Sequence, residues 1–133
     1  MRKTYRDLID AAEAEIETLS VDEAIKRHEE SQDTVFVDLR DVRELWREGT
    51  VPGARHCPRG MLEFWIDPES PYHKSFFSEP GKRFVFFCQS GWRSALATRT
   101  AQELGLEAVA HVGGGFRAWA DAGGPVEPVE KKG

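Results

Sequence analysis

The sequence predicts an α/β fold with a mostly parallel sheet, and three observations support that prediction. Short apolar runs typical of buried strands, such as 34–39 and 83–87, recur along the chain. Amphipathic segments with helix-capping signals lie between these runs. Strands that alternate with helices are typical of parallel sheets, because each parallel pairing needs a crossover connection.

The first half of the chain contains three predicted helices and three extended segments. We expect a helix at 4–16, an extended segment around Leu19, a helix at 21–29, a strand at 34–39, a short helix that ends before Gly49, and a strand at 54–57. Two capping boxes, Ser20 with Glu23 and Asp41 with Glu44, mark the starts of two of these helices. The first helix is expected to form an arm (residues 1–16) attached to a domain at 17–126.

The second half of the chain begins with an irregular segment, 58–82, that four prolines interrupt. This segment is rich in aromatic residues: Phe64, Trp65, Tyr72, Phe76 and Phe77. After it we expect a strand at 83–87, a helix at 94–104, a strand at 108–112 and a helix at 116–122. Residues from Pro125 onward are polar and contain two prolines, so we expect a loose tail, assigned to 127–133.

Length and composition exclude several classes of protein. The 133 residues suffice for one domain, and the net charge of −5 argues against a nucleic-acid-binding protein. No apolar run approaches the roughly 20 residues of a membrane span, and no apolar stretch near the first residues predicts a secretory signal. Two cysteines make no disulfide framework, so a cytoplasmic location is expected. We expect no cofactor and no metal site, because the His and Cys spacings match no usual ligand pattern.

Cys88 follows the predicted strand 83–87 and precedes the predicted helix 94–104. In parallel sheets, sites form beyond the carboxyl ends of the strands, which is where this cysteine falls. The amino terminus of a helix offers free N–H groups and a partial positive charge, and both stabilise a thiolate. Gly91 allows the tight bend that turns the loop amides inward, and Arg93 adds a fixed cation. The loop therefore predicts a cysteine that is ionised at neutral pH.

Four motifs together resemble the rhodanese family of sulfurtransferases in its single-domain form. They are Asp38-Leu39-Arg40 with Glu44, the turn 49–54, the loop Cys88-x-x-Gly91-x-Arg93-Ser94, and Gly113-Gly114-Gly115-Phe116-x-x-Trp119. The resemblance runs from about Leu19 to Pro125. It implies a five-stranded parallel sheet flanked by helices on both faces, and a cysteine that carries sulfur as a persulfide.

The resemblance also implies roles for individual residues. Cys88 is the expected nucleophile, which takes sulfur from a small anionic donor such as thiosulfate and passes it to cyanide, a thiol or an acceptor protein. The expected substrate-binding residues are Gln89, Ser90, Gly91, Trp92, Arg93 and Ser94. Arg59, which follows a strand end, is either a second anion contact or a solvated charge.

The sequence departs from the family pattern at two places. Thr50 stands where the family often has histidine in its Gly-His-Ile/Val-Pro-Gly-Ala turn, and we expect little catalytic cost from this change. The aromatic segment 59–77 is longer than in the smallest members. We expect it to wall the substrate pocket, although aromatic residues in such a segment are also typical of a local core.

Two other functions stay open for the cysteine loop. Cysteine-dependent phosphatases and arsenate reductases also combine a cysteine, a ring of amides and an arginine, but they place five residues between cysteine and arginine. Here four residues, 89–92, separate Cys88 from Arg93, and a tighter loop suits one sulfur atom better than a phosphoryl group. The other alternative is a sulfur-carrier or binding module that serves a specific partner protein.

Several residues have simpler structural interpretations. Cys88 itself could be a buried structural thiol, and Cys57 is interpreted as a packing residue that could pair with Cys88 on oxidation. Asp38 and Arg40 are expected to form an ion pair at the end of the sheet, and Glu44 to act only as a helix cap. Phe116 and Trp119 are expected in the core. The glycines at 113–115 form a tight turn and lack the spacing of a phosphate-binding fingerprint.

Overall fold

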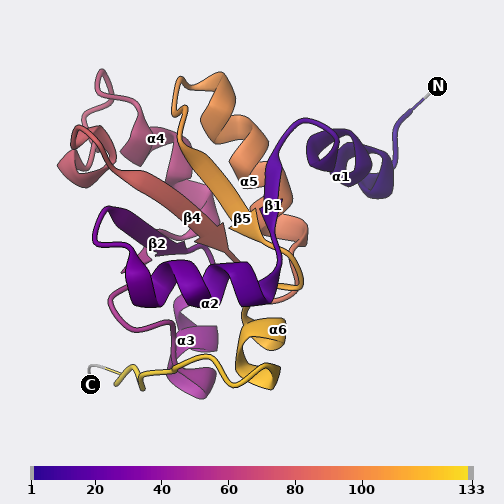
Figure 1. The fold of residues 1–133 in the computed structure, drawn as a ribbon. Helices are drawn as coiled ribbons and strands as arrows, with labels where there is room; N and C mark the ends of the chain where they lie inside the picture. Colours follow the sequence, from indigo (N-terminus) through magenta and orange to yellow (C-terminus); the bar gives the residue numbers. More distant parts are fainter. Residues whose placement is uncertain (1, 132–133) are drawn as a thin grey trace.

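In the computed structural model, which describes residues 2–131, strands alternate with helices along the chain (Figure 1). The strands are β1 (Glu17–Leu19), β2 (Thr34–Asp38), β3 (Arg55–His56), β4 (Arg83–Phe87) and β5 (Val109–Val112). The α-helices are α1 (Tyr5–Glu13), α2 (Val21–Glu30), α3 (Val42–Glu48), α4 (Leu62–Ile66), α5 (Trp92–Glu103) and α6 (Gly115–Asp121). Two 3-10 turns, η1 (Arg59–Met61) and η2 (Ser75–Ser78), lie in the predicted irregular segment.

The five strands form one sheet in the order β1-β5-β4-β2-β3, and every neighbouring pair is parallel. The predicted α/β fold with a five-stranded parallel sheet is therefore confirmed. Asp38 lies opposite Phe87 in the register of β2 and β4, so the segments that follow these two strands emerge side by side. Cys88 is the first residue beyond the carboxyl end of β4.

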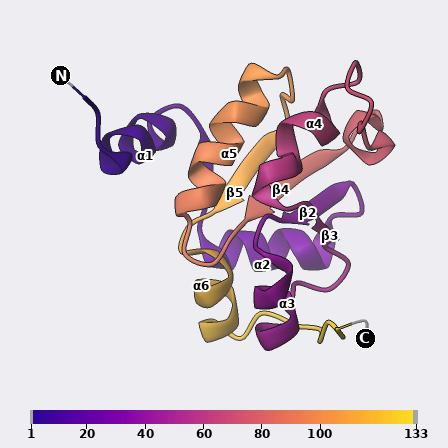
Figure 2. The same cartoon turned by 180° about the vertical axis from the view of Figure 1, so that it is seen from behind.

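Helices cover both faces of the sheet, as the two opposite views show (Figures 1 and 2). One core cluster lies between the sheet and helices α4 and α5 and includes Val37, Leu39, Leu62, Ile66, Phe84, Phe86, Ala97 and Ala101. The other lies on the face covered by α2 and α6 and includes Ala24, Phe36, Val85, Phe87, Ala110, Phe116 and Trp119. The expectation that Phe116 and Trp119 belong to the core is confirmed.

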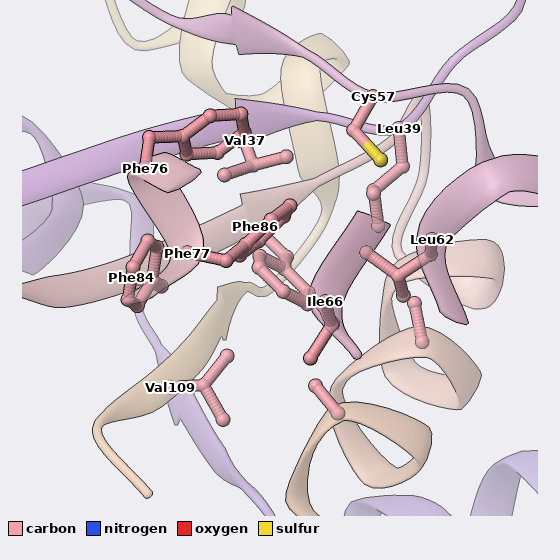
Figure 3. Close-up of a cluster of buried hydrophobic side chains, with 12 residues drawn as sticks. Val37, Leu39, Cys57, Leu62, Ile66, Phe76, Phe77, Phe84, Phe86 and Val109 are labelled. Atoms are coloured by element: carbon pink, nitrogen blue, oxygen red, sulfur yellow. The ribbon is translucent and has the colours of Figure 1, made fainter. Parts of the chain in front are cut away.

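The aromatic segment completes the first of these cores, so of its two interpretations the structure supports the local core rather than the wall of a substrate pocket. Phe76 and Phe77 are buried among β-strand residues, and the ring of Phe77 lies 5.4 Å from that of Phe84 (Figure 3). Trp65 packs against this cluster, whereas Phe64 is half exposed. The physical reason is that β2 and β4 present a broad apolar face that the short helix α4 cannot cover alone.

Helix α1 docks on α5, so the arm has a fixed place on the domain. Its apolar side is buried through Ile9 and Ala12, and Glu15 pairs with Arg99 of α5 at 2.8 Å. The ring of Tyr5 lies 5.0 Å from that of Trp92, the first residue of α5. The arm therefore reaches the loop that carries Cys88.

The carboxyl-terminal tail is anchored where we expected it to be loose. Thr50 and Glu127 exchange two backbone hydrogen bonds of 2.9 Å, and the indole N–H of Trp119 donates to the carbonyl of Pro125 at 2.7 Å. The tail runs from α6 past α3 (Figure 2). Backbone groups of the turn that follows α3 form hydrogen bonds with the tail, and the local sequence gives no sign of these bonds. The predicted loose tail also included residues 132–133, which lie outside the residues that the structure describes.

Candidate functional site

The cysteine loop is a tight turn between β4 and α5 that points two backbone amides at one sulfur atom. Gly91 has φ 105°, a left-handed conformation that glycine adopts without strain, and α5 begins directly after it. The amides of Gly91 and Ser94 donate to the Cys88 Sγ at 3.2 and 3.3 Å. Cys88 is 1% exposed. The loop therefore holds the sulfur at a helix amino terminus with two convergent donors, as the sequence predicted.

The glycine turn before α6 supports this loop from behind. The amides of Phe116 and Arg117 donate to the carbonyls of Cys88 and Gln89 at 2.8 and 3.1 Å. Gly115 has φ 63°, and a Cβ on it would lie 2.5 Å from the Cys88 carbonyl oxygen. The turn thus has a function beyond chain reversal, because glycine there allows backbone to lie against backbone.

A second contact of the sulfur comes from Ser94, which connects it to a buried histidine. Ser94 Oγ lies 3.5 Å from Cys88 Sγ and 2.9 Å from Nδ1 of His111 on β5. The other ring nitrogen, Nε2, lies 3.0 Å from Thr18 Oγ1 on β1. His111 is 1% exposed, and burial lowers the pKa of its ring from 6.5 to about 4. The ring is therefore neutral at pH 7.

His111 is the residue at this site that the sequence analysis missed. It occupies a short strand whose other residues are all apolar and buried, which is an unusual place for a histidine. It lies opposite Phe86 in the register of β4 and β5. Since side chains alternate along a strand, His111 and Cys88, two residues after Phe86, face the same side of the sheet. The sequence signal that could have identified His111 was its position as the one polar residue in the apolar strand β5.

Arg93 is paired with Glu44 in a bidentate contact, with N–O distances of 2.8 and 3.0 Å. The contact raises the pKa of Arg93 and lowers the pKa of Glu44. Glu44 also caps α3 by accepting from the Asp41 amide, so the expectation that it acts only as a cap is wrong. The Arg93 side chain remains 40% exposed, which leaves part of the guanidinium accessible to an anion.

The predicted ion pair between Asp38 and Arg40 is confirmed and is completely buried. Arg40 donates to both carboxylate oxygens of Asp38, to the Gly49 carbonyl and to the Gln89 side chain. Thr50 adds a hydroxyl donor to Asp38 at 2.7 Å, so the unusual residue of the turn has a structural partner. This network ties the end of β2 to the cysteine loop.

The remaining predicted residues lie around the loop or away from it. Trp92 is 45% exposed and has the guanidinium of Arg6 over its ring at 5.2 Å; Ser90 is also exposed. Arg59 lies on η1, where its side chain is 29% exposed and pairs with Glu63 at 2.9 Å, so it is not simply a solvated charge. Its contact with an anion stays a prediction. Cys57 is a buried free thiol in the first core cluster, and burial raises its pKa to about 12.

Comparison with known proteins identifies the family. The model of the rhodanese-like domain matches residues 20–122. The chain belongs to the rhodanese-like domain family. Among its relatives, the putative sulfurtransferase YtwF of Bacillus subtilis is 33% identical over 79% of this chain and 88% of its own length. The mouse thiosulfate sulfurtransferase/rhodanese-like domain-containing protein 3 is 31% identical over 67% of this chain, and the match spans 59% of the mouse protein.

Solved structures agree on the rhodanese fold but differ in their descriptions. The polysulfide-sulfur transferase of Wolinella succinogenes is 30% identical, with a TM-score of 0.70 over 94% of this chain and 88% of its own. A Rhodopseudomonas palustris protein of unknown function, described as a possible tyrosine phosphatase, is 53% identical with a TM-score of 0.92 over 96% of both chains. Within residues 2–131, no helix has the length and apolarity needed to cross a bilayer.

Proposed function

We propose that this rhodanese-like protein is a sulfurtransferase that carries a sulfane sulfur as a persulfide on Cys88. The observation that carries the proposal is the pair of amides, from Gly91 and Ser94, that converge on the cysteine sulfur. Donors fixed in this way stabilise negative charge on sulfur before and after transfer, with no reorganisation during the reaction. The family and the relatives named as sulfurtransferases support the same reaction class.

The proposed reaction has two steps. The Cys88 thiolate attacks the outer sulfur of a donor such as thiosulfate, and the sulfur–sulfur bond breaks so that sulfite leaves with the electron pair. The persulfide then presents its outer sulfur to cyanide or a thiolate, and the Cys88 thiolate leaves with the electron pair. The enzyme ends as it began, and the two substrates need not be bound together. We propose the cytoplasm as the compartment, since both cysteines are free thiols.

A phosphatase is the alternative that the description of the Rhodopseudomonas palustris protein raises. One feature of this chain favours sulfur transfer instead. Only four residues separate Cys88 from Arg93, whereas the phosphatase loop has five, and a tighter ring of amides suits one sulfur atom better than a phosphoryl group. An aryl phosphate assay separates the two functions, because the sulfurtransferase should leave that substrate intact.

A carrier that serves a protein acceptor is the other alternative, and a Bacillus subtilis relative bears the name of a putative sulfur carrier protein. A carrier should react slowly with cyanide and small thiols and form a complex with a specific protein. Steady turnover of thiosulfate and cyanide by the chain alone would argue against this role.

The first test is the intact mass of the protein after incubation with thiosulfate in the absence of reductant. The wild type should gain about 32 Da, one sulfur atom, and Cys88→Ser should gain nothing because it lacks the nucleophile. Cys57→Ala is the matched control, since it removes the other thiol and should keep the gain. A gain in Cys88→Ser would place the persulfide elsewhere and refute the assignment. If thiosulfate gives no gain in any variant, polysulfide as donor separates a wrong donor from an inactive thiol.

A further inference from the structure

An unbroken line of polar contacts runs from the buried sulfur to the surface through Ser94, His111 and Thr18. The line runs from Cys88 Sγ to Ser94 Oγ (3.5 Å), from there to His111 Nδ1 (2.9 Å), and from Nε2 to Thr18 Oγ1 (3.0 Å). Cys88, Ser94 and His111 are buried, whereas Thr18 on β1 is exposed. The described residues thus connect a solvent-shielded thiol with water at the edge of the sheet.

We propose that this line conducts the Cys88 thiol proton to solvent through a change of tautomer in His111. With a thiol, Sγ–H donates to Ser94 Oγ, the serine hydroxyl donates to Nδ1, and Nε2–H donates to Thr18. With a thiolate, each donor and acceptor is exchanged: Thr18 donates to Nε2, Nδ1–H donates to Ser94, and the serine hydroxyl donates to the sulfur. The three heavy-atom contacts are the same in both states.

The proton balance of this step is complete without a further reactant. Sulfur loses its proton to Ser94, Ser94 passes its own to Nδ1, and Nε2 passes one to Thr18, which releases its hydroxyl proton to water. One proton leaves, one negative charge stays on sulfur, and no group changes oxidation state. The three residues of the line, Ser94, His111 and Thr18, act on the reaction only by moving the proton of Cys88. They are positioning residues, and none of them needs to touch the substrate.

The burial of His111 determines how the ring can act. Because burial lowers the pKa of the ring to about 4, a cationic imidazolium is disfavoured next to the sulfur. His111 is therefore a poor counter-ion for the thiolate, unlike the histidine of a cysteine–histidine pair. A neutral ring can still conduct a proton, since it accepts at one nitrogen while it donates from the other. The contacts of both ring nitrogens fit this role.

Other charged groups near the sulfur are the same in all variants of the test. Arg93 of α5 interacts with Cys88 by charge and is paired with Glu44 of α3. Asp38 and Arg40, at the end of β2, pair with each other. A change confined to Thr18 or His111 removes none of these groups, so a change in the rate of thiol ionisation reports on the line of contacts.

The direct test is the tautomer of His111, read from the ¹⁵N ring signals of labelled protein below and above the pH midpoint of Cys88 alkylation by iodoacetamide. Nδ1 should become the protonated nitrogen as the thiol ionises, and His111→Asn assigns the signals. In Cys88→Ser, which cannot ionise over this range, the tautomer should stay constant. A wild-type ring that keeps one tautomer on both sides of the midpoint overturns the proposal.

A second test acts at the exposed end of the line, where folding is least affected. Thr18→Val removes the hydroxyl and keeps the side-chain shape, so the line loses its link to water. After a pH jump, the thiolate absorbance should rise several-fold more slowly than in the wild type, whereas the alkylation midpoint should stay the same, because the Thr18 contact is made in both states. Thr18→Ser should restore the wild-type rate. Thr34→Val, at the amino end of β2, is the matched strand control and should change nothing. A Thr18→Val rate equal to that of Thr34→Val contradicts the proposal.

The inference rests on the proposed role of Cys88 as a nucleophile, but the two can fail separately. The persulfide mass measures sulfur transfer, whereas the ring signals and the rate of thiolate formation after a pH jump measure proton transfer alone. A tautomer change without a persulfide would support the proton path and refute the proposed sulfur transfer. A persulfide without the tautomer change would support sulfur transfer and refute the proton path.

Discussion

At the scale of single residues, Glu44 decides how much of Arg93 is available to a substrate. The carboxylate neutralises the guanidinium of Arg93 and accepts the capping bond from the Asp41 amide at the same time. An anionic donor must therefore either share Arg93 with Glu44 or displace the carboxylate. Glu44 is the residue that makes the site less attractive to anions than the bare sequence motif suggests.

Glu44→Gln separates these roles, because glutamine keeps an oxygen for the helix cap and loses the charge. If Arg93 binds the donor, the variant should lower the KM for thiosulfate by roughly 3- to 10-fold, since one like-charged competitor is removed. Arg93→Ala should raise that KM by a similar factor. Steady-state kinetics at fixed ionic strength measure both. An unchanged KM in the two variants would restrict Arg93 and Glu44 to a structural ion pair.

At the scale of elements, the glycine turn between β5 and α6 and the cysteine loop form one unit. Their backbones are joined by the bonds from Phe116 and Arg117, and Gly91 lies close to Gly114, where an added Cβ on Gly91 would be 3.5 Å from the Gly114 amide. The shape of the loop is therefore set by a segment that follows it by more than twenty residues. Strand β5 carries His111 and leads directly into this turn.

Gly115→Ala tests this dependence against Gly123→Ala. Both glycines have positive φ, 63° and 82°, but only Gly115 would place its Cβ against the cysteine loop, whereas Gly123 has open space. Gly123→Ala should cost about 1 kcal/mol of stability and keep sulfur transfer. Gly115→Ala should cost more and lower kcat, because the amides move off the sulfur. Denaturant unfolding and turnover measure the two effects; equal behaviour of the variants would show that the turn does not shape the loop.

At the scale of the whole molecule, the sequence predicts what depends on neighbours along the chain. The capping boxes at Ser20 and Asp41 are present as predicted, and the strand, cysteine loop and helix follow in the predicted order. Local chemistry suffices for these features, since a cap or a tight turn is decided within a few residues.

The sequence does not predict what depends on the order of strands in the sheet. His111 meets Thr18 across 93 residues and Ser94 across 17, and it does so because β5 lies between β1 and β4. The pairing of Glu44 with Arg93 likewise spans 49 residues. The tail is held by backbone groups of Thr50, which carry no sequence signal. Each contact becomes visible only when the sheet has been assembled.

The assembled sheet also makes stability depend on pH through His111. The folded ring, with a pKa of about 4, binds its proton less tightly than an unfolded ring at 6.5. Between these values the unfolded chain holds more protons, so stability from this group is complete above pH 6.5 and is lost as the pH falls toward 4. At pH 4.5 the loss should be about 2 to 3 kcal/mol relative to pH 7.

His111→Asn isolates this contribution, because asparagine can keep a bond to Ser94 and does not titrate. Its free energy of unfolding should be lower than that of the wild type at pH 7, and the difference should shrink by that amount at pH 4.5. Urea unfolding at the two pH values measures it, and other groups cancel in the comparison. A difference that stays constant between pH 7 and 4.5 would mean that the buried ring is protonated with little cost, and a neutral relay to Cys88 would lose its physical basis.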